Sequence, residues 1–228
     1  MDDDATLVTT RKSLHLLAVQ VISPLRVQAT GNEIALRVRP EGYGTPDLPD
    51  GGWVGTRGTQ LVRVGGDGDE DATAITSLRA AARFVGLEDR VASALPDDAL
   101  EVHNGAALVL ADAWATGEEA LQALLDGARS ADDAAPINLW PEHFDIATEL
   151  GTADTRATYG ISPGDADHTE PYAYVSPWTT PSETGPHTFW NAAGFTGAER
   201  LLVDDPDEVL AFFREAHRLL TRPAGAGA

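Results

Sequence analysis

The segment from Ile137 to Ile146 concentrates residue types that carry chemistry. His143 and Asp145 are two positions apart, so both point to one face if the chain continues as a strand after Pro141. Imidazole and carboxylate groups are metal ligands and also proton carriers. The pattern therefore predicts a metal site or a His–carboxylate acid–base pair. A polar strand face that only contacts water or neighbouring side chains is the alternative.

A second set of ligand-type residues lies between Tyr159 and Pro171. It comprises Asp165, Asp167, His168 and Glu170. Together with His143 and Asp145, these residues form a predicted metal site, and a divalent metal ion is the one cofactor that the set suggests. The alternative is a Ser-Pro-Gly-Asp turn followed by a solvated acidic loop.

Aromatic side chains follow in the same third of the chain. Tyr172, Tyr174 and Ser176 share one face of a predicted strand. Aromatic walls with a few polar groups are typical of small-molecule sites, although antiparallel sheets pack with the same residues. The full set of ligand-binding candidates is His143, Asp145, Arg156, Trp178, Trp190 and Asn191. Arg156 would hold an anionic group or pair with a nearby acid.

Several enzyme classes lose support because their motifs are missing. The chain has no cysteine, no Gly-x-Ser-x-Gly elbow, no phosphate-binding glycine loop and no dinucleotide fingerprint. The run from Asp67 to Asp71 resembles the start of an EF-hand loop, but Ala72 and Leu78 occupy positions that require Gly and Glu. His15, His103 and His217 show no partners in the sequence.

The charge balance narrows the range of partners. The chain has 36 acidic and 16 basic residues and a net charge of -20, which disfavours nucleic acid and anionic membranes as partners. Adaptation to high salt would also explain the acidity. No export signal or long apolar run is evident, and the absence of cysteine fits a cytoplasmic protein.

Periodicity predicts an α+β fold in which an antiparallel sheet packs with several helices. The chain is expected to form a single domain over residues 1–228 with flexible ends at 1–10 and 222–228, and a split near Asp133 is the alternative. In the first half of the chain, the predicted elements are a helix over 10–25 with Pro24 as a stop or kink, a strand over 33–39, a loop over 40–58, a strand over 59–64 and a helix over 75–86. Two helical pieces are predicted within 105–129, the second capped by Thr116. A meander of short strands around 137–140, 144–149, 155–161 and 172–175 and a last helix capped by Asp205 complete the prediction.

Three strings carry a resemblance. They are Leu-Trp-Pro-Glu-His-Phe-Asp at 139–145, Tyr-Gly-Ile-Ser-Pro-Gly-Asp at 159–165 and Glu-Pro-Tyr-Ala-Tyr-Val at 170–175. With these motifs the chain resembles an uncharacterised family common in actinobacteria. The resemblance implies a bacterial cytosolic origin and carries no activity.

Three hypotheses for function follow. The leading one is a protein that binds a small molecule or metal ion through the His, carboxylate and aromatic cluster. The second is a hydrolase-like enzyme in which Asp145 or Asp167 orients His143 as a base. The third is a non-enzymatic interaction or structural protein, in the form of a homo-oligomer, whose aromatic residues belong to the core.

Overall fold

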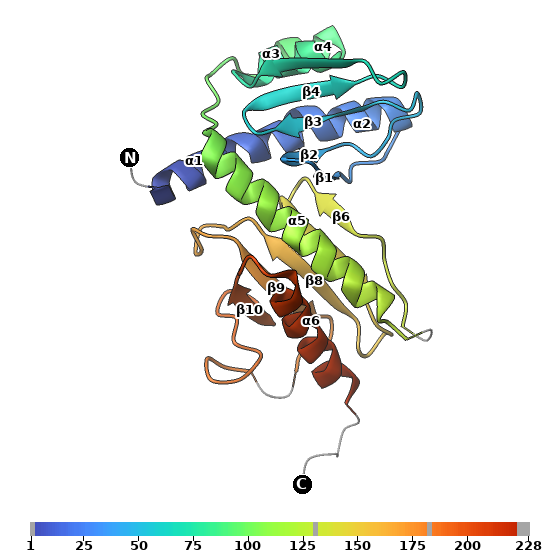
Figure 1. Cartoon of the computed structure of the whole chain (residues 1–228), viewed down its shortest axis with the longest axis vertical. Helices are drawn as coiled ribbons and strands as arrows, with labels where there is room; N and C mark the ends of the chain where they lie inside the picture. The colour runs from blue at the N-terminus through green and yellow to red at the C-terminus, as the bar shows by residue number, and fades with distance from the viewer. Residues whose placement is uncertain (1–2, 130–131, 182–183, 223–228) are drawn as a thin grey trace. The chain divides into compact units, whose positions relative to one another are not determined.

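The computed structural model describes residues 3–129, 132–181 and 184–222, and it divides into two compact units (Figure 1). The first unit comprises Met1–Asp112 and Asn138–Asp145, and the second comprises Ala113–Ile137 and Ile146–Ala228. Two five-stranded antiparallel sheets and several helices make up the predicted α+β fold. No helix of the described residues is both long and apolar enough to span a membrane.

The first unit begins with a long helical segment. It consists of α1 (Asp3–Leu17), a π-helical turn η1 (Ala18–Ile22) and α2 (Ser23–Thr30). Pro24 has no N–H to donate, but it does not end the helical segment. The π turn lies just before it, and there the Ser23 N–H donates to the Ala18 carbonyl. The predicted stop at Pro24 is therefore wrong, because the helical segment continues to Thr30. Residues 3–10, which belong to the end expected to be flexible, are helical.

The first sheet has the strand order β1-β2-β3-β4-β5. Its strands are β1 (Arg37–Arg39), β2 (Gly42–Gly44), β3 (Trp53–Arg57), β4 (Gln60–Val64) and β5 (Glu70–Ala74). The buried Tyr43 joins this sheet to the helical segment, because its hydroxyl donates to the Leu14 carbonyl at 2.6 Å. The unit also contains α3 (Leu78–Val85), α4 (Asp89–Ala94), the first part of α5 (Asn104–Asp126) and β6 (Asn138–Trp140).

Two predictions for the first sheet are wrong. The predicted loop over 40–58 contains β2 and β3, and the predicted strand over 33–39 is regular only from Arg37. The glycines that suggest a loop are instead required by close strand pairing. A Cβ atom on Gly44 would lie 2.5 Å from the Val54 carbonyl oxygen, and one on Gly55 would lie 2.3 Å from that of Tyr43. The predicted strand over 59–64 and the helix ending at Gly86 are confirmed.

The second unit is a meander covered by helices. Its strands β7 (Asp145–Leu150), β8 (Ala157–Ser162), β9 (Tyr172–Pro177) and β10 (Ala198–Leu201) follow one another in the order β10-β9-β8-β7. The helix α6 (Pro206–Thr221) lies across β8 and β9, where Phe213 meets Tyr159 edge to face (Figure 1). Asp205 caps α6 as predicted by accepting from the Asp207 N–H.

The helix α5 is continuous where the sequence predicts two pieces. Thr116 therefore lies in mid-helix and caps nothing. The adjacent Gly117 is buried against the sheet of the second unit, and a Cβ atom there would lie 2.4 Å from Ile161 Cγ1 and 3.1 Å from Ile146 Cγ2. A glycine that resembles a helix breaker thus allows the helix to approach the strands closely.

We expect Gly117→Ala to lower the free energy of unfolding by about 1–3 kcal/mol, because the added methyl overlaps buried isoleucine side chains. Gly105→Ala in the same helix is the matched control, since no atom lies within 4 Å of its added Cβ. The control should stabilise the protein by about 0.5–1 kcal/mol through helix propensity. Urea unfolding of both variants measures the difference, and equal stabilisation by both would contradict this packing.

Candidate functional site

The segment that holds His143 and Asp145 is not a continuous strand. Residues 141–144 form a turn, Phe144 adopts a left-handed backbone conformation with φ of 59°, and β7 starts at Asp145. The prediction that His143 and Asp145 share a strand face is therefore wrong. His143 is exposed, and it makes no hydrogen bond or ion pair with another of the described residues. The geometry gives no support to His143 as a base held by a carboxylate.

The residue that anchors this turn is His15 from α1. Its Nε2–H donates to the Glu142 carbonyl oxygen at 3.1 Å, and its ring stacks on Phe144 with centroids 5.0 Å apart. Phe144 is buried and meets Tyr43 edge to face. The histidine without a partner in the sequence thus fixes the backbone of residues 141–144.

The acidic loop of the second unit brings together part of the predicted metal set. Asp165 accepts from the backbone N–H groups of Asp167 and His168, each at 2.8 Å, and from the Tyr172 hydroxyl at 2.7 Å. The His168 ring lies between two carboxylates, with Nδ1 3.2 Å from Asp165 and Nε2 3.5 Å from Glu199. Glu199 comes from β10 and is not predicted by the sequence, because it is 31 positions beyond His168 on a different element.

This arrangement differs from a metal centre. Both ring nitrogens of His168 face carboxylate oxygens, whereas a metal ligand must direct a lone pair at the ion. Over residues 3–129, 132–181 and 184–222, no three His, Cys, Asp or Glu side chains gather as metal ligands would. Asp167 and Glu170 are exposed on the loop. The cluster ties the loop to the sheet.

Hydrogen bonding shifts the ionisation of this loop. Burial opposes ionisation of Asp165, but hydrogen bonds from the Tyr172 hydroxyl and from the backbone N–H groups of His168 and Asp167 outweigh it. The pKa of Asp165 therefore lies below its ordinary value. Burial, and then the hydrogen bond to Asp165, raise the pKa of Tyr172 well above its ordinary value, so the hydroxyl stays a donor.

The remaining ligand-binding candidates have structural partners. Arg156 donates to Glu149 at 2.8 Å and to Asp133 at 3.0 Å, and it lies over the Trp178 ring at 5.1 Å from the centroid. Its charge is thus engaged by acids of the same unit. Trp190 is buried and packs edge to face on Phe189, while the Asn191 side chain accepts from the Glu199 N–H at 3.0 Å.

A third cluster has the order of groups found in hydrolytic triads. Asp132 Oδ2 lies 3.4 Å from His217 Nε2, and His217 Nδ1 lies 3.3 Å from the Tyr159 hydroxyl. Burial, and then the charge of Asp132, raise the pKa of Tyr159, whose exposed fraction is 0%. A hydroxyl that no substrate reaches cannot act as a nucleophile, so this cluster links α6 to β8. His217, which shows no partner in the sequence, has two.

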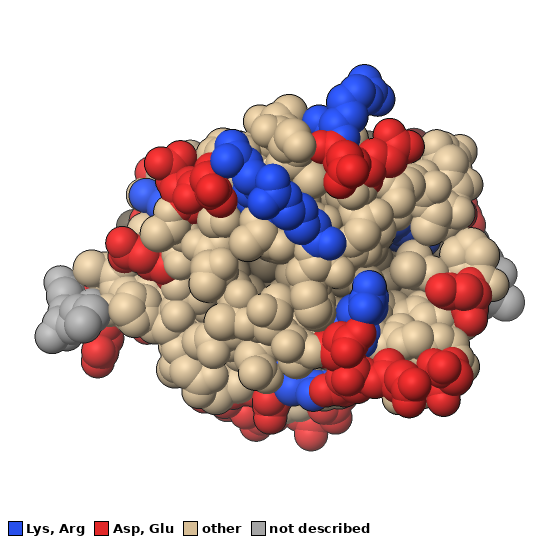
Figure 2. Space-filling view, turned by 90° about the horizontal axis from the view of Figure 1, so that it is seen from above, with Lys and Arg blue, Asp and Glu red and all other residues tan. Residues whose placement is uncertain are grey.

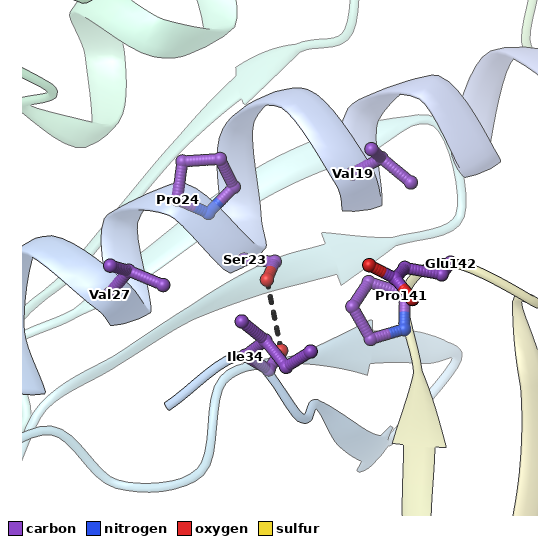
Figure 3. Close-up of a pocket in the computed structure, with 7 residues that line it drawn as sticks. All are labelled: Val19, Ser23, Pro24, Val27, Ile34, Pro141 and Glu142. Carbon is purple, nitrogen blue, oxygen red and sulfur yellow. Dashed lines mark hydrogen bonds between the residues drawn. The ribbon is translucent and has the colours of Figure 1, made fainter. Parts of the chain in front are cut away.

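The first unit contains an open pocket of about 330 Å³ (Figure 3). Its lining residues are Val19, Ser23, Pro24, Val27, Ile34, Pro141 and Glu142. Ser23 Oγ donates to the Ile34 carbonyl at 3.0 Å and holds α2 to the segment before β1. Of the lining residues, only Pro141 and Glu142 belong to a motif that the sequence singles out, the Leu139–Asp145 string. The aliphatic residues of the helix cannot be distinguished from core residues by sequence alone.

Charge is distributed unevenly over the molecule. Acidic side chains form several groups on the face drawn in Figure 2, and basic side chains lie beside some of them. Many arginines are paired with acids, as in Arg39–Asp47 at 2.9 Å, Arg57–Glu70 at 2.7 Å and Arg63–Asp71 at 2.6 Å. With a net charge of -20, the pairing leaves a large excess of unpaired acid.

Neither a protein-family model, a curated protein nor a solved structure matches the chain.

We expect Asp165→Asn to destabilise the second unit at neutral pH, since the carboxylate that accepts three hydrogen bonds is lost. A carboxyl group whose pKa falls on folding stabilises the fold above its unfolded pKa of about 4, and this contribution disappears as the pH drops through the lower folded value. The free energy of unfolding of the variant should therefore fall less than that of the wild type as the pH drops below about 4. Thermal unfolding across this range measures it, and the exposed Asp167→Asn is the control. Parallel curves for Asp165→Asn and the wild type would contradict the assignment.

Proposed function

We propose that this protein binds a small molecule by enclosing an apolar group of the ligand in the pocket of the first unit. The observation that carries the proposal is the lining, which is apolar except for Ser23 and Glu142. Pockets of a few hundred Å³ with this composition are where proteins usually hold small ligands.

The walls of the pocket are aliphatic side chains that remain accessible to water. Val19 is 39% exposed and Ile34 is 37% exposed, on opposite sides of the opening. Covering such surface is favourable by about 25 cal/mol per Å². A ligand that contacts both side chains would remove their apolar surface from water, and this burial would favour binding.

Hydrogen bonds hold the segments around the pocket together. The Ser23–Ile34 hydrogen bond closes one side, and the His15–Glu142 hydrogen bond fixes the turn on the other. The backbone pairing of Leu36 with Leu139, at 2.8 and 2.9 Å, holds the strand segments beside the pocket together. A preformed site loses little conformational entropy when the ligand arrives.

We expect 1-hexanol to bind the wild-type protein and to bind Ile34→Asp about tenfold more weakly, because the substitution replaces an apolar wall by a charge. Leu201→Asp is the matched control: it changes another exposed aliphatic residue, which does not line the pocket, and should leave the affinity unchanged. Amide chemical shifts of Val19, Ser23, Val27 and Ile34, followed by NMR during titration, measure the affinity.

The proposal fails if hexanol leaves these amide shifts unchanged at saturating concentration. Sedimentation of the free proteins distinguishes the interaction alternative. Self-association of the wild type that Ile34→Asp abolishes, without hexanol binding, would assign the exposed aliphatic residues to a protein contact instead.

A further inference from the structure

The polar side-chain groups that line the pocket and remain available to a ligand are acceptors. Pro24 and Pro141 have no N–H, and the Ser23 hydroxyl already donates to the Ile34 carbonyl. The side chains of Val19, Val27 and Ile34 have no polar atoms. The lining therefore offers a ligand no free side-chain donor.

The π turn leaves a backbone acceptor of a lining residue without a helical donor. The Ser23 N–H donates to the Ala18 carbonyl, five residues earlier. The next residue, Pro24, has no N–H to donate to Val19 in the same pattern. The Val19 carbonyl therefore receives a helical hydrogen bond from neither Ser23 nor Pro24. Val19 is one of the residues that line the pocket.

Glu142 is the one ionisable residue among those that line the pocket. It is exposed, and no ion pair with a described basic residue is recorded for it. Arg26, the basic residue of α2, is paired with Glu33. Val19 and Glu142 lie at one end of the pocket, and Val27 lies at the other (Figure 3).

On the proposed function, we infer that the ligand is a primary alkylammonium, with its charged group at the Val19 and Glu142 end and its hydrocarbon chain toward Val27. An ammonium group supplies three donors and no acceptor, which complements a carboxylate and a carbonyl. The excess of negative charge on the protein also favours the approach of a cation.

The test compares three probes with the same hydrocarbon chain: n-hexylamine, 1-hexanol and hexanoate. Amide shifts of the pocket residues during titration at low ionic strength give each affinity. We expect the amine to bind most tightly and hexanoate most weakly. Glu142→Gln should weaken the amine about two- to fivefold, the effect of one exposed charge pair, and should leave hexanol unchanged. Glu101→Gln, which removes an exposed acid outside the lining, is the control.

The outcomes separate the inference from the function on which it depends. Equal binding of amine and alcohol, or an equal loss in Glu142→Gln and Glu101→Gln, would overturn the ammonium and leave the apolar pocket. Preference for hexanoate would also overturn it. If none of the three probes shifts the pocket amides, the proposed function itself falls.

Discussion

Pro24 constrains the first unit, because it lies within a helical segment from Asp3 to Thr30 and cannot donate a backbone hydrogen bond. A helix interrupted in this way usually bends or ends. Here the π turn over Ala18–Ile22 takes up an additional residue, so that Leu17, Val21 and Ile22 all remain fully buried. The same turn places Val19 and Ser23 beside Ile34, where the pocket opens. The core and the pocket thus depend on one local departure from α-helical geometry.

The histidines show how position decides the role of a titratable side chain. His143 has the most suggestive neighbours in the sequence and is exposed on a turn. His15 and His217 have none, yet His15 holds the turn at Glu142 and His217 joins Asp132 to Tyr159. His168 is fixed between Asp165 and Glu199. Each of these three histidines has a partner on a distant element, Glu142 for His15, Glu199 for His168 and both Asp132 and Tyr159 for His217, and side-chain spacing along the chain does not reveal it.

The elements that could be predicted are those fixed by local chemistry. The cap of α6 at Asp205, the glycine end of α3 at Gly86 and the meander in the second unit follow from periodicity and turn residues. The failures arise where tertiary packing overrides local preference. Glycines that favour a loop allow β2 and β3 to pair closely, and Gly117 allows α5 to pass over the sheet unbroken.

The site was less predictable than the fold for the same reason. Asp165 and His168 do meet, but the second carboxylate, Glu199, comes from β10. The pocket combines residues of the first helical segment with Pro141 and Glu142, which follow β6. Aliphatic residues in a helix carry no sequence signal that separates a pocket wall from a core position.

The two units are interleaved along the chain, and this governs the order in which the protein is built. Residues 138–145 belong to the first unit but follow the stretch 113–137, which belongs to the second. The His15–Glu142 hydrogen bond closes a separation of 127 residues. During synthesis, the pocket of the first unit can therefore be completed only after residues 113–137 of the second unit have been made, because Pro141 and Glu142 follow them. Long-range closure of this kind makes folding slow relative to units formed from one continuous stretch.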